Sequence, residues 1–328
     1  APGTPMTYPP PSMATALPED LIFVGDVHLG RRPVGLDAAL EREGLSPEAL
    51  SPAAALARLV DHLLGGTPPR AVVFAGDLVD QENDRFEALA VLEREVGRLT
   101  AAGIPVLAVA GNHDCLVLPR LVELVPDVHL VGAGGTWERV ELAGPGPAVD
   151  LIGWSFPTSH VHACPLDQGG FEAALAGARP GALGLGVLHG DLDATGSPYG
   201  PVPRRRLEAA GLDGWFLGHV HAPADLTVRP PLGYLGSLVG LKPTETGPRG
   251  AWRVTPGTGG AQGVETRWHM APAHTATDRG WHLTRVRART APVRQWKVTR
   301  QGGEMRLAPM SDAARDADPG RTGAGSEA

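Results

Sequence analysis

Apolar runs that end in polar residues recur along the first two thirds of the chain. The segments LIFVGD (21–26), AVVFAGD (71–77) and IPVLAVAGNHD (104–114) each carry a continuous apolar run of strand length before their polar end. Such runs are typical of strands that are buried on both faces. The same pattern predicts further buried strands at 148–156, 183–191 and 214–221.

Helical spacing of apolar residues appears between these runs. Residues 47–64 and 84–101 predict amphipathic helices, the second with Asp84 as its cap, and 204–211 is helix-like. Strands that alternate with helices indicate an α/β fold whose sheet is covered on both faces. After about residue 226 the pattern changes to short β-like segments, at 226–230, 233–237, 250–256 and 263–270. We expect these segments to pair as antiparallel strands that close the domain.

The pattern divides the chain into one large domain and less structured ends. We expect the domain to cover residues 20–270, followed by a basic, β-rich extension over 271–306. The polar segments 1–19 and 307–328 are expected to be disordered tails.

Charge is distributed unevenly between these parts. Residues 267–306 contain nine Lys or Arg and two Asp or Glu, a net charge of +7, whereas the whole chain carries −7. Trp268, Trp281 and Trp296 lie in the same stretch. Arginine with aromatic side chains suits phosphates and stacked bases. A solvated β surface is the alternative interpretation of this stretch.

The composition indicates the cellular compartment in which the protein is expected. The two cysteines, Cys115 and Cys164, provide neither a disulfide framework nor a thiolate zinc site, which favours a reducing compartment. No apolar run approaches the ~20 residues needed to span a bilayer. The N-terminal segment has neither a basic region nor an apolar core of the kind found in signal peptides. We therefore expect a cytoplasmic protein without a membrane partner.

Asp, Asn and His side chains gather where the predicted strands end. They are Asp26, His28, Asp77, Asp80, Asn112, His113, Asp114, His189, His219 and His221. Ligands bind at the carboxyl ends of strands in α/β sheets. Oxygen and imidazole donors without sulfur suit manganese, iron or zinc. Seven or eight such donors exceed the needs of one ion, so we expect two metal ions that share a bridging carboxylate.

The segment GHVH at 218–221 fits a two-metal site in detail. His219 and His221 stand at i and i+2 on an extended segment, so their side chains point the same way. Each can then hold one of two ions that lie ~3.5–4 Å apart. Gly218 allows the backbone to approach the site closely.

Each polar residue also has a simpler interpretation when taken alone. Asp26, Asp77 and Asn112 could be turn or helix-cap residues, and His189 could be a structural histidine. As a set that follows apolar strands, these residues favour metal ligation. Asp114 is expected to be a structural partner.

Three further residues near these motifs stay outside the predicted ligand set. Asp191 is interpreted as a turn residue. His160 and His162 lie in a loop-like segment and are candidates for the lining of a substrate cleft.

Five short motifs, GDVH, GDLVD, GNHD, LHGD and GHVH, resemble in their order the signatures of the calcineurin-like metallophosphoesterases over roughly residues 20–250. The resemblance implies an α/β, sandwich-like fold with central mixed β-sheets flanked by helices and a β-rich C-terminal extension. It also implies two metal sites that share Asp77, the first with Asp26, His28 and His221 and the second with Asn112, His189 and His219. His113 would face the substrate, and Asp80 would orient His113.

The resemblance implies a metal-dependent phosphoesterase. Two divalent ions, manganese with Fe²⁺ or Zn²⁺ as alternatives, would lower the pKa of a bridging water and supply a hydroxide that attacks phosphorus. His113, as an imidazolium, would donate a proton to the leaving oxygen.

Further details resemble DNA repair exonucleases of the SbcD type. These details are DVHLG at 26–30, the layout of 76–114 and the Glu-x-Gly-x-x-Gly segment within 233–254. The sequence departs from that family at Tyr234-Leu235-Gly236, where Tyr-Pro-Gly is usual, and at Cys115, where Ser is common. The resemblance implies a Mn²⁺-dependent nuclease with DNA and an SMC-like ATPase as partners, and by analogy a homodimer.

Two other functions stay open. One is hydrolysis of a small substrate, such as a cyclic nucleotide, a nucleotide or a phosphoprotein, by an enzyme of the same fold. The other is a non-enzymatic binding module, which the complete set of candidate ligands disfavours.

Overall fold

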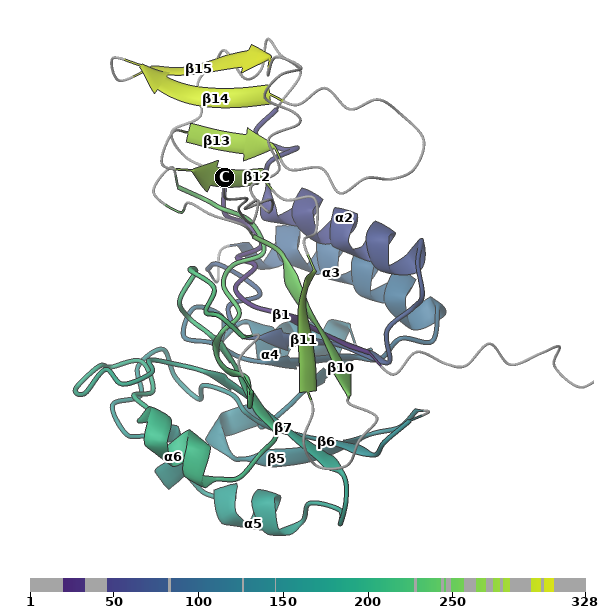
Figure 1. Ribbon diagram of the computed structural model, residues 1–328, viewed down its shortest axis with the longest axis vertical. Coiled ribbons are helices and arrows are strands. Elements are labelled where there is room, and N and C mark those ends of the chain that lie inside the picture. The colour runs from purple at the N-terminus through teal and green to yellow at the C-terminus, as the bar shows by residue number, and fades with distance from the viewer. Residues whose placement is uncertain are drawn as a thin grey trace, which may run out of the picture.

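The structure is a computed structural model of the 328-residue chain. It describes residues 20–32, 46–81, 84–125, 127–144, 146–226, 229–242, 245 and 249–256, and the backbone of five strands between 264 and 309. Two sheets pack face to face, with helices on their outer sides, and a further small sheet follows in the chain (Figure 1).

The first sheet has the strand order β11-β10-β1-β2-β3-β4. Its strands are β1 (Leu21–Val24), β2 (Ala71–Ala75), β3 (Val106–Val109), β4 (Val128–Leu130), β10 (Ala251–Pro256) and β11 (Val264–His269). The pairs from β1 to β4 are parallel, whereas β10 pairs antiparallel with both β1 and β11. The predicted antiparallel strands at 250–256 and 263–270 are thus confirmed.

The second sheet has the strand order β5-β6-β7-β8-β9. Its strands are β5 (Glu138–Leu142), β6 (Val149–Trp154), β7 (Leu183–His189), β8 (Gly214–Gly218) and β9 (Leu232–Tyr234). β5 is antiparallel to β6, and the other pairs are parallel.

The expectation of an antiparallel strand at 233–237 is wrong, because β9 runs parallel to β8 with Trp215 opposite Leu232. A parallel neighbour needs a crossover of about a dozen residues or more, and residues 219–231 provide one. The strand expected at 226–230 does not form at the described residues of that segment, and residues 227–228 lie outside the description.

The core has two layers because successive residues of a strand face opposite sides. Leu21 and Phe23 of β1 belong to the cluster between the two sheets, where the rings of Phe23 and Phe216 stack with centroids 4.1 Å apart. Ile22 and Val24 belong to the larger cluster, which also contains the apolar faces of the helices. The first sheet is therefore covered on both faces, as predicted, with the second sheet covering one of them.

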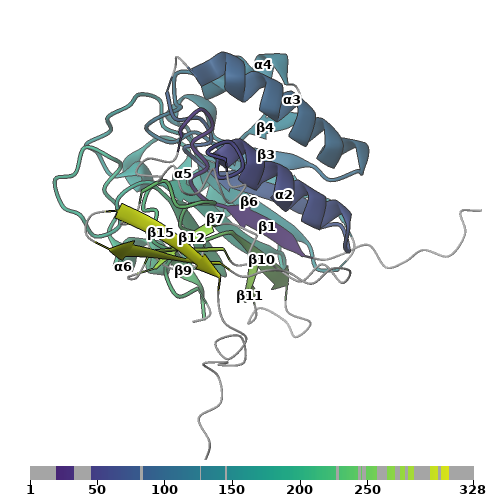
Figure 2. The ribbon, with the colours of Figure 1, turned by 90° about the horizontal axis from the view of Figure 1, so that it is seen from above.

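The helices are α2 (Pro52–Leu64), α3 (Arg85–Ala101), α4 (Leu118–Leu124), α5 (Phe171–Ala176) and α6 (Arg204–Ala209), with short 3-10 turns at Ala133–Gly135 and Pro165–Asp167. In Figures 1 and 2, α2 and α3 lie together beside the first sheet, and Figure 1 places α5 and α6 beyond the second. None of the described helices is long and apolar enough to cross a membrane.

Two helix starts differ from prediction. The helix expected from residue 47 begins at Pro52, where Ser51 accepts a hydrogen bond from the backbone N of Ala54 at 3.2 Å. Asp84 stands at the N-cap position of α3, but its side chain makes no capping hydrogen bond. It lies instead against Gly30, where an added Cβ would overlap it.

The C-terminal strands form a separate antiparallel sheet. They are β12 (His274–Thr277), β13 (Gly280–Leu283), β14 (Trp296–Gln301) and β15 (Glu304–Pro309). Figure 1 draws this sheet apart from the other two. These strands lie in the segment 271–306 that was expected to be β-rich, and β15 continues three residues into the segment expected to be a disordered tail. The basic and tryptophan side chains of 267–306 lie outside the described residues.

Candidate metal centre

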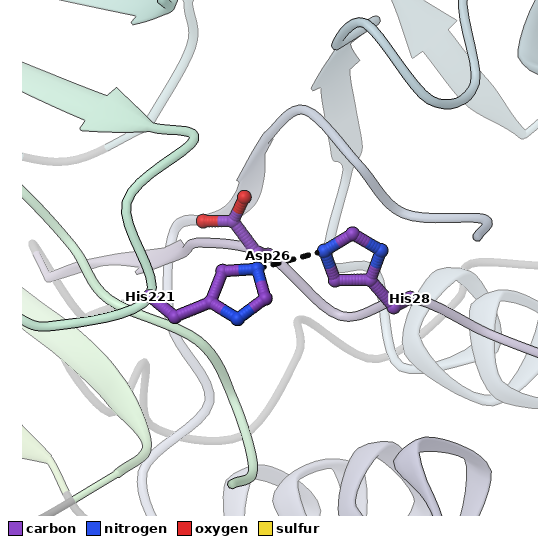
Figure 3. A group of neighbouring side chains, drawn as sticks. All are labelled: Asp26, His28 and His221. Carbon is purple, nitrogen blue, oxygen red and sulfur yellow. Dashed lines mark hydrogen bonds between the residues drawn. The ribbon is translucent and has the colours of Figure 1, made fainter. Parts of the chain in front are cut away.

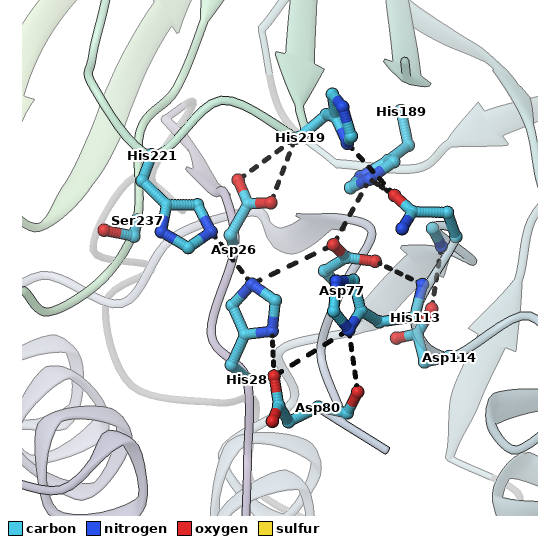
Figure 4. Close-up of polar contacts among 12 residues, drawn as sticks. Asp26, His28, Asp77, Asp80, His113, Asp114, His189, His219, His221 and Ser237 are labelled. Atoms are coloured by element: carbon cyan, nitrogen blue, oxygen red, sulfur yellow. Dashed lines mark hydrogen bonds and ion pairs between the residues drawn. The ribbon is translucent and has the colours of Figure 1, made fainter. Parts of the chain in front are cut away.

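The polar residues predicted from the sequence meet at one edge of the two sheets (Figure 4). Asp26 and Asp77 each follow a strand of the first sheet by two residues, after β1 and β2, and Asn112 follows β3 by three. His189 ends β7, and His219 directly follows β8. Because these strands run parallel within each sheet, their carboxyl ends present the side chains to a common space.

The backbone at this edge adopts conformations that side chains rarely take. His28, Asp77 and His219 have φ angles of 55°, 50° and 100°. Each such residue costs on the order of 1–3 kcal/mol, so the surrounding structure must hold it. The N–H of His28 donates to the Asp77 carbonyl at 2.9 Å, and the N–H of His219 donates to the Asp26 carboxylate at 3.0 Å.

Gly218 permits the close approach that the sequence predicts. A Cβ at this position would overlap the carbonyl oxygen of Ala75 and would lie 2.8 Å from Nδ1 of His189. The end of β8 therefore fits against β2 and β7 only without a side chain here.

Asp26, His28 and His221 form the first metal group (Figure 3). The Nε2 atoms of His28 and His221 lie 3.0 Å apart. Their Nδ1 atoms lie against carboxylates, His28 at 2.8 Å from Asp80 Oδ1 and His221 at 2.9 Å from Glu245 Oε1. A carboxylate favours the proton on the nitrogen beside it, so both Nε2 atoms present lone pairs to each other. This arrangement fits a cation between the two rings.

Asp77, His189 and His219 form the second metal group, with Asn112 beside them. His189 Nδ1 donates to the Ala75 carbonyl at 2.9 Å, so in the neutral ring Nε2 carries the lone pair that a cation could bind. That Nε2 lies 3.0 Å from Asn112 Oδ1 and 3.4 Å from Asp77 Oδ2. His219 Nδ1 lies 3.0 Å from the same Asn112 oxygen. Acceptor atoms therefore converge here too.

Asp77 lies between the two groups. Its Oδ2 is 3.4 Å from His189 Nε2 and 3.9 Å from His28 Nε2, while Oδ1 accepts the backbone N–H of His113 at 3.0 Å. Burial raises the pKa of Asp77, but the nearby imidazoles, His189 first, outweigh it and hold the pKa well below its usual range. The same pairing outweighs burial at His189 and raises its pKa to about 9. A buried ionised carboxylate that faces both groups fits a ligand shared by two cations.

His113 lies beside the first group with its ring partly in solvent. Its side chain is 39% exposed, against 21% for His221 and 17% for His219. Nδ1 donates to the backbone carbonyl of Asp80 at 2.9 Å, which directs Nε2 away from Asp80. The Asp80 carboxylate is closer to His28 Nδ1, at 2.8 Å, than to His113 Nδ1, at 3.8 Å. Asp80 therefore contacts His113 mainly through its main chain.

Asp114 has the structural role expected for it. It is fully buried, and its carboxylate accepts backbone N–H groups of Gly111 and Leu78, both at 2.7 Å. Burial and the neighbouring Asp77 charge raise the pKa of Asp114 to about 7. These bonds tie the loop after β3 to the loop after β2.

Two carboxylates at the site were not among the predicted site residues. Asp191, interpreted as a turn residue, places Oδ1 3.3 Å from His219 Nε2. Glu245 contacts His221, and its position as the first residue of Glu-x-Gly-x-x-Gly was the available signal. Burial raises the pKa of Glu245, but the hydrogen bond from His221 contributes most to lowering it to about 2.

His160 lies close to the second group. Its ring stacks on Tyr199 with centroids 5.6 Å apart, and the Tyr199 ring lies 5.1 Å from that of His219. His162 belongs to none of the metal groups found among the described residues.

The donor set fits two divalent cations. Each group consists of imidazole nitrogens and carboxylate oxygens, Asn112 adds an amide oxygen, and no sulfur takes part. Asp77 connects the groups, and three of the ligand imidazoles have their outer nitrogen beside a carboxylate. Outer partners of this kind are typical of metal-binding histidines.

The chain is similar in sequence to two curated proteins. The chain is 28% identical over 187 residues to the uncharacterized metallophosphoesterase YhaO of Bacillus subtilis (strain 168), covering 56% of the chain and 44% of that protein. It is 38% identical over 94 residues to the DNA double-strand break repair protein Mre11 of Aeropyrum pernix, covering 29% of the chain and 20% of that protein. The matches thus span less than half the length of either relative.

Similar solved structures include two proteins of Thermus thermophilus. The sulfate thiohydrolase SoxB in complex with glycerol has a TM-score of 0.44 and 16% identity, covering 80% of this chain and 58% of SoxB. The protein TT1561 has a TM-score of 0.40 and 12% identity, covering 67% and 90% of the two chains.

A sequence profile of the calcineurin-like phosphoesterases matches residues 20–223, which include every predicted metal ligand. Members of this family are typically dinuclear, metal-dependent phosphoesterases. With both the sequence match and the two candidate metal groups in place, the chain belongs to the calcineurin-like phosphoesterase family.

Proposed function

We propose that this protein is a two-metal phosphodiesterase, and that its substrate is DNA, cut as by a repair exonuclease of the SbcD type. The observation that carries the proposal is the pair of acceptor groups that share buried Asp77 beside the exposed ring of His113. In this proposal Asp26, His28, Asp77 and His221 hold one ion, and Asp77, Asn112, His189 and His219 hold the other.

Two divalent ions bound there would supply water activation and neutralisation of phosphate charge. The chain itself would position the substrate and move a proton. His113 is held through Nδ1 by the Asp80 carbonyl, so its Nε2 is the atom available to a phosphate ester in solvent. In the imidazolium form, Nε2 donates its proton to the leaving oxygen of the ester.

Support for DNA as the substrate comes from the sequence. The motifs around Asp26 and Glu245 resemble SbcD-type nucleases, and one matched relative is the double-strand break repair protein Mre11. The net charge of +7 over 267–306 suits a phosphate backbone. Manganese, an SMC-like ATPase partner and a homodimer belong to the same proposal.

Hydrolysis of two substrates in parallel tests the proposal. The wild-type chain, His113→Ala and Asp77→Ala are assayed with Mn²⁺ on bis(p-nitrophenyl) phosphate and on end-labelled linear duplex DNA. We expect the wild type to cut both substrates, Asp77→Ala to cut neither, and His113→Ala to fail on DNA with a smaller loss on the nitrophenyl diester, whose leaving group needs no proton. Cleavage of the small diester alone would contradict DNA as a substrate of the isolated chain, and cleavage of neither would contradict the phosphodiesterase assignment.

A further inference from the structure

Glu245 occupies the outer side of a candidate metal ligand. Its Oε1 lies 2.9 Å from Nδ1 of His221, while Nε2 of the same ring faces His28. We propose that Glu245 is a positioning residue, which holds His221 in the tautomer and orientation that let Nε2 bind the first metal ion. The inference rests on the two-metal site of the proposed function.

The Glu245 carboxylate is itself fixed. Its Oε2 accepts the backbone N–H of Leu241 at 2.7 Å, and its own N–H donates to the carbonyl of Lys242 at 3.0 Å. With Oε2 and the main-chain N–H both held, Oε1 has a defined direction toward His221. A carboxylate held in this way fixes the proton of an imidazole on the adjacent nitrogen and raises the basicity of the other nitrogen.

The same segment also holds the backbone of His221. The carbonyl of His221 accepts the N–H of Ser237 at 3.0 Å and a hydrogen bond from Nη1 of Arg249. Arg249 is almost fully buried, and its Nη1 also donates to Ser237 Oγ at 2.9 Å. The main chain of His221 is therefore held by Ser237 and Arg249, and the ring nitrogen that faces away from His28 contacts Glu245.

Direct ligation by Glu245 does not fit this geometry. Figure 3 shows one ring nitrogen of His221 directed at His28 and the other directed away from it. Glu245 contacts the nitrogen directed away, and it belongs to neither metal group. Its influence on a metal ion would therefore pass through His221.

The chain contains a matched control. Glu138 also places Oε1 on a histidine, 2.8 Å from His129 Nε2, and its Oε2 accepts a backbone N–H, that of Gly132 at 2.8 Å. This pair is exposed, and neither residue belongs to a metal group found in the described part of the chain. Glu138→Gln therefore makes the same chemical change without touching the metal centre.

The experiment measures Mn²⁺ binding to the full chain by isothermal titration calorimetry, for wild type, Glu245→Gln and Glu138→Gln. A glutamine at 245 has one acceptor oxygen, so it cannot serve both Leu241 N–H and His221 Nδ1–H. We expect Glu245→Gln to weaken one of the two Mn²⁺ affinities by about 10–100-fold and to leave the other unchanged. Glu138→Gln should leave both affinities unchanged.

Melting temperatures of the chelated proteins separate positioning from folding. If Glu245→Gln melts lower than wild type but binds both Mn²⁺ ions equally well, Glu245 is only structural and the inference is wrong. If Glu245→Gln does not fold, Glu245→Asp is measured in its place. We then expect a smaller loss of Mn²⁺ affinity at the same single site, and two unchanged affinities would overturn the inference.

A wild type that binds fewer than two ions would overturn both the inference and the two-metal site. Two ions with the expected selective loss, but no ester hydrolysis, would support the inference and contradict the proposed function.

Discussion

The two metal groups are supported in different ways. In the second group, His189 is fully buried, and its outer nitrogen rests on the main-chain carbonyl of Ala75 in β2. In the first group, the outer nitrogens of His28 and His221 rest on side chains, Asp80 and Glu245. The second group is therefore built partly into the contact between the two sheets, with Asp191 beside its other imidazole, whereas both imidazoles of the first group depend on loop side chains.

The difference suggests a division of roles. A ligand fixed by backbone in a dry core is preorganised, which favours tight metal binding. The first group lies next to His113, whose ring centroid is 5.0 Å from that of His28, and His113 is the most exposed of these histidines. We expect the second group to anchor its ion more tightly and the first group to face the substrate.

Asp77→Asn should have the largest effect, because it removes the charge that both groups share. We expect bis(p-nitrophenyl) phosphate hydrolysis to fall by at least about 10²–10³-fold, as when a preorganised electrostatic contact is removed. Mn²⁺ titration should show both affinities weakened. If only one Mn²⁺ affinity is weakened, Asp77 belongs to one group alone and is not a ligand shared by both ions.

His113 groups with His28 and Asp80, but its Nδ1 donates to the Asp80 carbonyl and so offers no lone pair to a cation. We therefore expect His113→Ala to affect catalysis while leaving metal binding unchanged. General acid catalysis contributes about 10²–10⁴-fold, so kcat should fall within that range for esters with poor leaving groups. The loss should be smaller for p-nitrophenol, which leaves without protonation. Equal losses for good and poor leaving groups would contradict a proton-donor role.

Removal of metal should lower thermal stability, because a cation that binds only the folded site stabilises the folded state. An ion present at 100 times its dissociation constant stabilises the folded state by about 2.7 kcal/mol. Domains of this size shift by about 2–4 °C per kcal/mol, so a chelator should lower Tm by about 5–10 °C. If the second group binds its ion more tightly than the first, Tm should fall in two steps as chelator is added. A fall in a single step would contradict a difference in affinity between the two groups.

Gly218→Ala should destabilise the contact between the sheets, because the added Cβ would overlap the Ala75 carbonyl. Overpacking of this kind costs about 1–3 kcal/mol. Urea unfolding of the chelated protein measures the loss directly. Gly97→Ala is the control, since no atom lies within 4 Å of its added Cβ, and equal effects of the two substitutions would contradict the close fit.

Asp191→Asn should have the smallest effect. Asp191 lies 3.3 Å from His219 Nε2 and is partly exposed, so the contact is worth about 0.5–1.5 kcal/mol. The Mn²⁺ affinity of one site should fall by no more than about tenfold. If Asp191→Asn lost more Mn²⁺ affinity than Glu245→Gln, the second group would depend on a side chain more strongly than the first, contrary to the comparison above.

The sequence predicted much of the site because strand ends are visible in it. Asp26, Asp77 and His189 each follow or end a continuous apolar run, so each marks the same edge of a sheet. That local signal is independent of how the strands pair. Apolar runs alone do not predict which strands are neighbours. The arrangement in two sheets was therefore expected only from the family resemblance.

The features that the sequence did not predict depend on long-range geometry. β9 is parallel to β8 because residues 219–231 form a crossover, which no local pattern announces. Asp191 reaches His219 from 28 positions away, and Glu245 reaches His221 from 24 positions away. Asp84 stands where a helix cap is expected from the sequence, but its side chain packs against Gly30 in the loop after β1.

The most direct test of the account is the number and coupling of Mn²⁺ ions in the wild-type chain, measured by metal analysis and electron paramagnetic resonance. The shared Asp77 predicts two ions per chain, ~3.5–4 Å apart and magnetically coupled, with the coupling lost in Asp77→Asn. A single ion, or two ions without coupling, would contradict a two-metal centre built on Asp77.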